Sequence, residues 1–179
     1  WHMGYLTLSS HEPWEVPFDK YQDPIDNSFA YTDHCLGNFI NQLKQTELWN
    51  NLLVIILPDH CCHIPGAEFA NSREFFHCPM LWIGGAIQKP FHFTKHMNQS
   101  DVAATIAAQL GLPTDDFMFS RNVFSSAYNN PFAFSCFNDG FMFTDSSGTI
   151  VYDHASQKNI EGNNPEQLLK GKAILQTIY

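Results

Sequence analysis

The hydrophobic pattern of the chain centres on one short apolar run, residues 52–57, which is followed by Pro58, Asp59 and His60. Six consecutive apolar residues predict a strand buried on both faces, because a half-buried strand would alternate apolar and polar positions. The polar pair then leaves the sheet at the carboxyl end of that strand, where ligands bind in open parallel α/β sheets. Asp59 and His60 are therefore the first candidates for a functional site.

The sequence before this run predicts a strand, a long loop and a helix. Residues 3–9 are expected to form the strand, and the Pro-punctuated loop after it is long enough to suggest a functional role. Ser28 is expected to cap the helix. The apolar positions of that helix recur at spacings of three and four residues: Leu36, Phe39, Ile40 and Leu43. A helix that feeds a strand in this order is typical of half a βαβ unit with parallel strands.

In the second half of the chain the spacing of apolar residues changes, from a strand and a helix to a series of short strand-like runs. Residues 79–85 predict a strand ended by a glycine turn, and Ser100 and Asp101 are expected to cap a helix over 102–110. Beyond these, three short runs rich in aromatic and β-branched residues alternate with turn residues, which predicts a three-strand antiparallel meander. Pro165 fits the first turn of a final helix.

Length and composition fit a globular protein with an acidic surface. The 179 residues are 44% hydrophobic and carry 18 acidic against nine Lys and Arg side chains, which gives a net charge of −9. We expect this charge to disfavour binding to nucleic acid and to anionic membranes, because both would repel it. No apolar run approaches the roughly 20 residues of a membrane helix. The five cysteines form no CxxC pair, so they leave the redox compartment open.

Asp59 and His60 suit a divalent-metal site, because carboxylate oxygen and imidazole nitrogen together bind Zn²⁺ or Mn²⁺ well. By chance alone, such a dipeptide is more often a structural loop cap. His11 follows the predicted first strand and would emerge at the same sheet edge if that strand lay parallel to residues 52–57. There an imidazole can hold an anionic oxygen or shuttle a proton. His77 is a further candidate that could reach the site from the second irregular loop.

Other chemistry-bearing residues are weaker candidates. Cys61, Cys62 and His63 directly follow the pair and could add soft ligands, although adjacent cysteines strain a common tetrahedral site. Asp33 and His34 are expected on the solvated face of the first helix. The chain has no Gly-rich phosphate loop, no GxSxG elbow and no recognisable nucleophile. Because hydrolytic or transfer chemistry at a metal normally needs a nucleophile and further ligands, we expect the catalytic residues to lie outside this chain.

Six motifs follow one another in a characteristic order along the chain. They are TLSSHEPWEVP (7–17), NSFAYTD (27–33), LGNFI (36–40), WNN leading to PDH (49–60), PMLWIGG (79–85) and SDVAAT (100–105). Together they resemble the carboxyl-terminal part of the lipoteichoic acid synthase-like group of sulfatases, within the alkaline phosphatase superfamily. Each motif alone is modest, and the ordered series, which covers nearly the whole chain, is specific.

The resemblance implies the carboxyl-terminal part of an alkaline phosphatase/sulfatase-like α/β sheet with flanking helices. It implies a divalent Mn, Mg or Zn ion held by Asp59 and His60. An acidic residue and a Thr, Ser or modified Cys nucleophile from an amino-terminal half would complete that site. His11 matches the family's substrate-binding histidine. Members of the group transfer phosphoglycerol or related phospho-groups from lipid donors, or hydrolyse phosphate or sulfate esters. Cys61 departs from the glycine that many relatives carry after the Asp-His pair.

We expect residues 1–128 to be the carboxyl-terminal part of the catalytic domain, with 129–179 as the meander and final helix packed on it. The chain begins without Met, which suggests a fragment of a longer protein, although His2 and Met3 could instead be a cloning scar. The resemblance implies a membrane-anchored parent with an extracytoplasmic catalytic domain. Alone the chain would bind metal weakly and turn over little or no substrate. The alternative is a noncatalytic domain of the same fold that binds a glycan or a protein partner. An upstream nucleophile and acidic ligand in the parent gene would separate the two.

Overall fold

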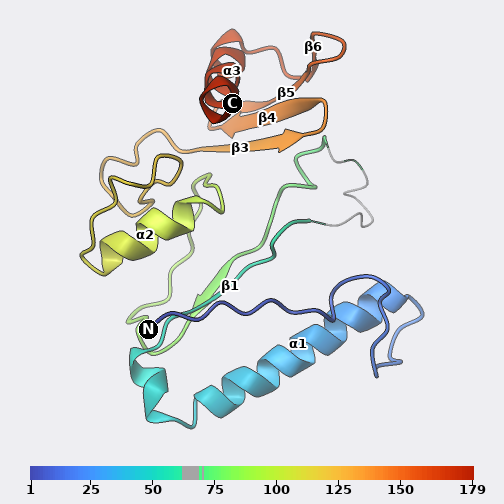
Figure 1. Cartoon of the computed structure of the whole chain (residues 1–179), viewed down its shortest axis with the longest axis vertical. Helices are drawn as coiled ribbons and strands as arrows, with labels where there is room; N and C mark the ends of the chain where they lie inside the picture. The colour runs from blue at the N-terminus through green and yellow to red at the C-terminus, as the bar shows by residue number, and fades with distance from the viewer. Residues whose placement is uncertain (62–68, 70) are drawn as a thin grey trace. The chain divides into compact units, whose positions relative to one another are not determined.

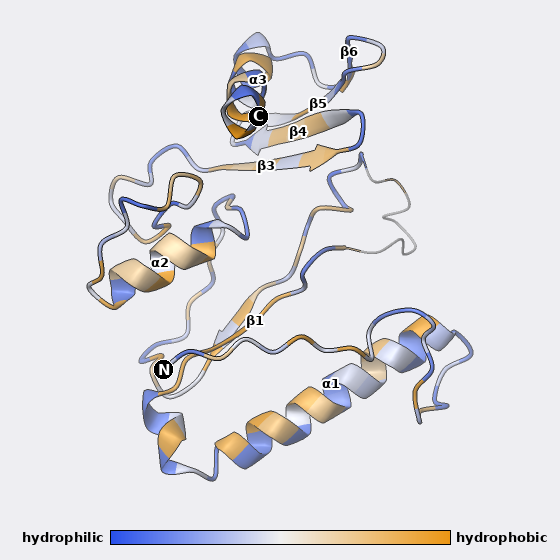
Figure 2. Cartoon of the chain, viewed as in Figure 1, coloured by the Kyte–Doolittle hydropathy of each residue, from blue (hydrophilic) through white to orange (hydrophobic). Residues whose placement is uncertain are grey.

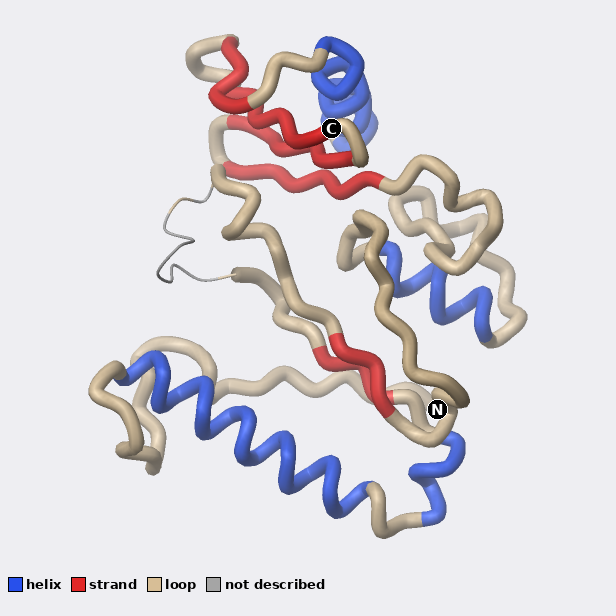
Figure 3. The backbone as a smooth tube through the Cα atoms, turned by 180° about the vertical axis from the view of Figure 1, so that it is seen from behind, coloured by secondary structure: helices blue, strands red, loops and turns tan. Residues whose placement is uncertain are grey.

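The structure is a computed structural model that describes residues 1–61, 69 and 71–179 of the chain. The chain divides into two compact units, one made of Trp1–Ile56 with Leu81–Pro90 and the other of Leu57–Met80 with Phe91–Tyr179. Figure 3 shows their helices and strands from behind. The expected division between residues 128 and 129 stays a prediction.

The main element of the first unit is α1, Pro24–Leu43 (Figure 1). Asp23 caps this helix, because its side chain accepts the backbone N–H of Ile25 at 2.8 Å. The prediction that Ser28 caps the helix is wrong. Ser28 is fully buried inside the first turns, where its hydroxyl donates to the carbonyl oxygen of Ser9 and joins the helix to the preceding loop.

A short two-stranded sheet follows α1. The 3₁₀ helix η1, Glu47–Asn51, leads into β1, Val54–Ile56, which pairs with β2, Leu81–Ile83. The pairing is antiparallel, with Ile55 opposite Trp82, so the expected parallel pairing does not occur among the described residues. Nor is β1 buried on both faces as predicted. It is half-buried, because one short neighbour covers less of a strand than a full sheet with helices on both faces.

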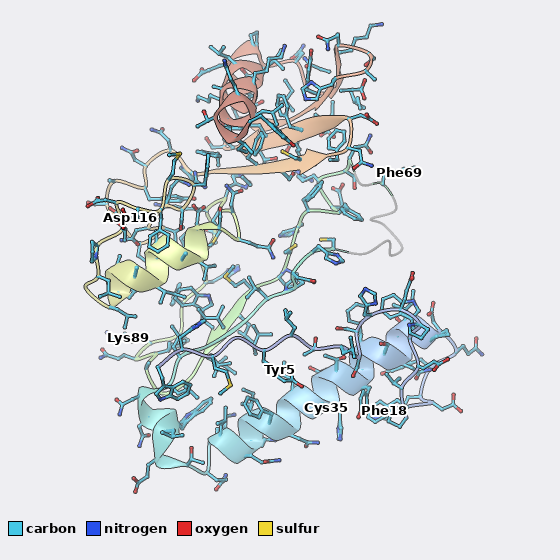
Figure 4. The ribbon with its side chains drawn as sticks, in the orientation of Figure 1. Tyr5, Phe18, Cys35, Phe69, Lys89 and Asp116 are labelled. Atoms are coloured by element: carbon cyan, nitrogen blue, oxygen red, sulfur yellow. The ribbon has the colours of Figure 1, made fainter. Side chains whose placement is uncertain are left out.

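The predicted strand over residues 3–9 is also wrong, since this part of the chain has no strand conformation. The side chains of Tyr5, Leu6 and Leu8 are 84–85% exposed. Figure 4 labels Tyr5 on this extended segment. Apolar character gives a segment the tendency to be a strand, but a strand also needs a neighbour that pairs its backbone N–H and C=O groups.

The predicted glycine turn after β2 is confirmed. Gly84 has a φ of +127°, and a Cβ placed there would lie 2.0 Å from the carbonyl oxygen of Leu52. A Cβ at Gly85 would lie 2.4 Å from the carbonyl oxygen of Trp49. Only glycine therefore allows the chain leaving β2 to pass this close to the residues that precede β1.

The second unit contains α2, Asp101–Gln109, as the sequence predicts. Asp101 is fully buried, and both of its carboxylate oxygens accept from Arg121, at 2.9 Å from Nε and 2.6 Å from Nη2. The backbone N–H of Asn98 also donates to this carboxylate, at 2.8 Å. One charged pair thus joins the start of α2 to the segment that follows it.

The carboxyl-terminal part of this unit is an antiparallel sheet covered by one helix. The sheet runs in sequence order through β3 (Phe132–Phe137), β4 (Gly140–Asp145), β5 (Gly148–Asp153) and β6 (Lys158–Glu161). The three predicted strands are confirmed. The fourth, β6, was not expected, because all four of its residues are exposed and they carry no alternating pattern.

The final helix, α3, spans Pro165–Ile178 and begins with the predicted Pro165. Asn164 caps it by accepting the backbone N–H of Glu166 at 3.0 Å. Apolar side chains of α3 pack on the inner face of the sheet, and Figure 2 shows the hydrophobic character of β4 beneath them. The core consists of Phe141, Phe143, Ile150 and Tyr152, with Leu168, Ile174 and Leu175 packed against it.

Candidate functional site

The Asp59-His60 pair lies in a bend after β1, as the sequence predicts. The carboxylate of Asp59 accepts the backbone N–H of His60 at 2.9 Å. The ring Nδ1 of His60 lies 2.7 Å from the carbonyl oxygen of Cys61. Because a carbonyl oxygen can only accept, this contact assigns the proton to Nδ1 and leaves Nε2 of the neutral ring with its lone pair.

Nε2 of His60, which carries the lone pair in the neutral ring, lies near the carboxylate of Asp59. Nε2 and Oδ2 are 3.6 Å apart, and the two side chains are 69% and 71% exposed. Two electron-pair donors at this separation do not hydrogen bond to each other, but both can bind one divalent cation at about 2.0–2.2 Å. A ligating histidine usually donates its other N–H to a carbonyl or carboxylate, as Nδ1 does here. The donor set therefore fits two ligands of a metal site.

No third ligand joins this pair in the part of the chain that the structure describes, where no group of three or more His, Cys, Asp or Glu side chains could hold a metal ion. Two ligands leave at least two positions of a tetrahedral ion open. The geometry is therefore that of a partial site.

Gln99 braces the backbone of the same bend. Its side-chain amide donates to the carbonyl oxygen of Pro58 at 2.5 Å and lies 3.5 Å from that of Asp59. Gln99 is two residues before α2, so the segment that leads into this helix contacts the bend. Nothing in the spacing of the sequence indicated this contact, since 40 or 41 residues separate the partners.

Two other Asp-His dipeptides in the chain test whether such a sequence is enough. Asp33 and His34 are exposed on α1, as predicted. His34 uses Nε2 to accept from the amide of Asn38 at 3.0 Å, and its ring packs against Phe18 at 5.3 Å between centroids. Adjacent residues on a helix do not face each other, so this dipeptide does not form a bidentate pair.

The third dipeptide, Asp153-His154, ends β5. The carboxylate of Asp153 accepts the backbone N–H of Ser156 at 2.5 Å, and hydrogen bonding from the side chain and then the backbone of Ser156 lowers the pKa of Asp153. The ring of His154 packs against the rings of Phe141 and Tyr152, with centroids 6.0 and 5.3 Å away. This pair shapes a turn and extends the core, so its structure fits no ligand role.

His11, the predicted substrate-binding residue, belongs to the first unit, whereas Asp59 and His60 belong to the second. Its Nδ1 lies 2.9 Å from the carbonyl oxygen of Glu12, so Nδ1 donates and Nε2 again keeps its lone pair. The ring is exposed and stacks on Trp14, with centroids 6.4 Å apart. His11 thus presents one free ring nitrogen to solvent.

Asn27 shapes the loop that carries His11 into α1. Its side-chain oxygen accepts the backbone N–H groups of Lys20 and Tyr21 at 2.8 and 2.9 Å, and its amide donates to the Tyr21 carbonyl at 2.8 Å. Asn27 is 92% buried, as its relative exposure is 8%. The sequence contained this residue in a motif, but no local pattern indicated that it would fold the loop.

The second predicted substrate residue, His77, is exposed and directly precedes Cys78. The sulfur of Cys78 lies 3.3 Å from that of Cys61, the residue after His60. Burial and the hydrogen bond with Cys78 raise the pKa of the Cys61 thiol to about 11, so this thiol is protonated at neutral pH and is a poor soft ligand. The other two weak candidates, Cys62 and His63, lie outside the described residues.

Comparisons with known proteins point to the same family as the motif series. The sulfatase family profile matches residues 3–112. The chain is 26% identical over 163 residues to the lipoteichoic acid synthase-like protein YvgJ of Bacillus subtilis, covering 74% of this chain and 26% of that protein. It is 38% identical over 73 residues to the catalytic subunit of human GPI ethanolamine phosphate transferase 2, covering 39% of this chain and 7% of that protein.

Two solved structures share the fold. A protein of the alkaline phosphatase superfamily from Vibrio parahaemolyticus superposes with a TM-score of 0.72 at 24% identity, over 93% of this chain and 45% of that one. The lipoteichoic acid synthase LtaP from Listeria monocytogenes superposes with a TM-score of 0.68 at 18% identity, over 96% of this chain and 51% of that one. The chain therefore spans about half the length of these structures.

The helices of the described residues include none that is long and apolar enough to cross a membrane. The family profile covers more than half of the chain, and the superposed structures extend the shared fold to nearly all of it. The resemblance read from the motif series and the expected α/β fold class are thereby confirmed. The chain belongs to the sulfatase family, with the fold of the alkaline phosphatase superfamily.

Proposed function

We propose that this chain is the carboxyl-terminal part of a metal-dependent hydrolase or phosphotransferase that acts on phosphate or sulfate esters at the cell envelope. In this proposal the chain supplies two metal ligands and two substrate-binding histidines, and the nucleophile lies elsewhere in the parent protein. Family membership supports the class of chemistry. The pair Asp59-His60 supports the position of the metal site.

One observation carries the metal assignment. Nδ1 of His60 donates to the Cys61 carbonyl, so in the neutral ring Nε2 is the nitrogen with the lone pair, and it lies 3.6 Å from a carboxylate oxygen of Asp59. Neither of the other two Asp-His dipeptides has this arrangement. A divalent Mn, Mg or Zn ion at these atoms would stabilise negative charge on the oxygens of a phosphate or sulfate ester.

The chain's own residues would then orient the ligands and the substrate. The Cys61 carbonyl fixes the tautomer of His60, and Gln99 limits the movement of the bend on which Asp59 stands. In the neutral ring of His11, Nε2 carries the lone pair, so it can accept a proton from a substrate hydroxyl and, when protonated, donate to an anionic oxygen. His77 is exposed and is proposed as a second contact for the anionic substrate.

The names of two relatives support a phosphate ester carried by a lipid as the substrate class. One is a GPI ethanolamine phosphate transferase and the other a lipoteichoic acid synthase-like protein. For the present chain, a lipid-linked phosphate ester at the cell envelope is accordingly proposed over a soluble sulfate ester.

The purified 179-residue chain should show no turnover above the metal blank on an aryl phosphate or an aryl sulfate in the presence of Mn²⁺, Mg²⁺ or Zn²⁺. A nucleophile and further ligands are needed for the reaction, and two ligands with a histidine do not provide them. Metal-dependent turnover that Asp59→Ala abolishes and Asp33→Ala preserves would contradict the proposal, because the chain would then hold a complete catalytic site.

A further inference from the structure

Two thiols lie in contact directly beside the proposed metal ligands. The sulfur atoms of Cys61 and Cys78 are 3.3 Å apart, and both residues are half-buried in the second unit. A disulfide has a sulfur–sulfur distance of about 2.05 Å, so a shift of roughly 1.3 Å would bring the two atoms to bonding distance. The loop ends that carry these residues are therefore already close enough to be linked.

The remaining described cysteines do not compete for this contact. Cys35, on α1, and Cys136, on β3, are both exposed, and neither lies beside another described cysteine. Cys62 lies outside the described residues, so it is tested below by substitution. Within the described structure, Cys61 and Cys78 are the one pair of cysteines in sulfur contact.

We propose that Cys61 and Cys78 form a disulfide, which would link the two ends of the segment 61–78. The oxidant is a small disulfide such as oxidised glutathione. One protein thiolate attacks a sulfur of the oxidant and releases the first glutathione thiol, and the second protein thiolate then displaces the other. In total the protein loses two electrons and two protons, and one oxidised glutathione becomes two reduced molecules.

The link would join the two predicted functional histidines through the backbone. His60 directly precedes Cys61, and His77 directly precedes Cys78. With Gln99 bound to the Pro58 carbonyl on the other side, the Asp59-His60 bend would be held at both of its ends. The disulfide stands on the sulfur contact alone. Its consequence for metal binding rests on the proposed function and is measured separately.

Peptide mapping tests the disulfide directly on the full chain. The chain is equilibrated with oxidised glutathione, its remaining thiols are alkylated, and it is digested with trypsin without reduction. Cleavage after Arg73 separates a peptide of residues 45–73, which contains Cys61 and Cys62, from a peptide of residues 74–95, which contains Cys78. The expected product is these two peptides joined, with a mass two hydrogens below their sum, and their separation on reduction.

Two substitutions assign the bond within the joined peptides. Cys62→Ser should leave the linked product unchanged, whereas adding Cys61→Ser to Cys62→Ser should remove it, with Cys35 and Cys136 alkylated in every case. Separately alkylated Cys61 and Cys78 after oxidation would overturn the proposal. A bond from Cys78 to Cys62 instead of Cys61 would also overturn the proposal. The same holds if Cys78 forms bonds equally with Cys35 and Cys136. Metal affinity of the oxidised chain and of the double variant is then compared, and a negative result there concerns the metal site only.

Discussion

Asp101 shows how a single residue can organise the second unit. Its carboxylate is fully buried and binds the guanidinium of Arg121 through two hydrogen bonds, while the N–H of Asn98 donates to the same group. The sequence predicted Asp101 only as part of a helix start. Its distant partner Arg121 could not be predicted, because 20 residues and an irregular segment separate the two.

Asp101→Ala should destabilise the chain by about 3–5 kcal/mol, because it leaves the charge of Arg121 without its buried partner. Urea unfolding followed by circular dichroism measures this loss. The matched control is Asp116→Ala at an exposed aspartate, which should change the free energy of unfolding by less than about 0.5 kcal/mol. Equal effects of the two substitutions would show that the Asp101–Arg121 pair has no special structural role.

The environment of Tyr128 leads us to expect that the free energy of unfolding falls at alkaline pH. The side chain of Tyr128 is buried, and its hydroxyl donates to the carbonyl oxygen of His96 at 2.7 Å. Burial raises the pKa of Tyr128 to about 12. The positive charge of Arg121 acts against this increase, and the negative charge of Asp101 adds to it. In the unfolded chain a tyrosine titrates near pH 10. Since the folded pKa is the higher one, its contribution is fully present below about pH 10 and is lost as the pH rises toward 12.

Tyr128→Phe should therefore flatten the loss of unfolding free energy across that alkaline range, as measured by urea titrations at a series of pH values. Tyr179→Phe, at a side chain that is 96% exposed, should leave the decline as it is in the unmodified chain. If the decline is the same with and without the Tyr128 hydroxyl, another group causes it.

The elements that the sequence predicted best are those whose signals are local. The start of α3 at Pro165 and the turns of the meander depend on residues within one or two turns, and they formed as expected. The helix α2 also formed, but Ser100 makes no side-chain capping hydrogen bond and Asp101 is its first helical residue. Residues 3–9 and the parallel pairing of β1 depended on a neighbouring strand, which the local apolar pattern does not specify. An edge strand with exposed polar residues, such as β6, has no local signal at all.

Two glycines, each inside a helix, allow the packing of α3 on β4 to be tested with the same substitution at a crowded site and at an open one. A Cβ at Gly171 on α3 would lie 2.1 Å from Cε2 of the fully buried Phe141, whereas a Cβ at Gly37 on α1 would meet nothing within 4 Å. Gly37→Ala should stabilise the chain by about 0.5–1 kcal/mol through helix propensity alone. Gly171→Ala should instead destabilise it by about 1–3 kcal/mol, because Phe141 must move within a packed core.

Thermal and urea unfolding of the two glycine variants measure these opposite effects. The sign is the decisive result, since both substitutions are chemically the same and both lie inside a helix. Stabilisation by Gly171→Ala would mean that α3 does not pack on β4 as closely as described.

At the scale of the whole molecule, the ordered motif series identified the family although the strand predicted over residues 3–9 and the parallel pairing of β1 were both wrong. The motifs contain residues that shape loops of this chain, such as Asn27 and the Asp59-His60 bend, and the order of the motifs does not depend on a correct secondary-structure prediction. The chain covers about half the length of the solved relatives.

Binding of Mn²⁺ to the 179-residue chain, followed by the loss of the free-ion electron paramagnetic resonance signal, tests the central claim that Asp59 and His60 are metal ligands. The account predicts one weak site whose affinity falls at least about tenfold in Asp59→Ala and in His60→Ala. Asp33→Ala, which alters the other exposed Asp-His dipeptide, should leave the affinity unchanged. Equal loss in Asp33→Ala and Asp59→Ala, or no loss in either, would contradict the account.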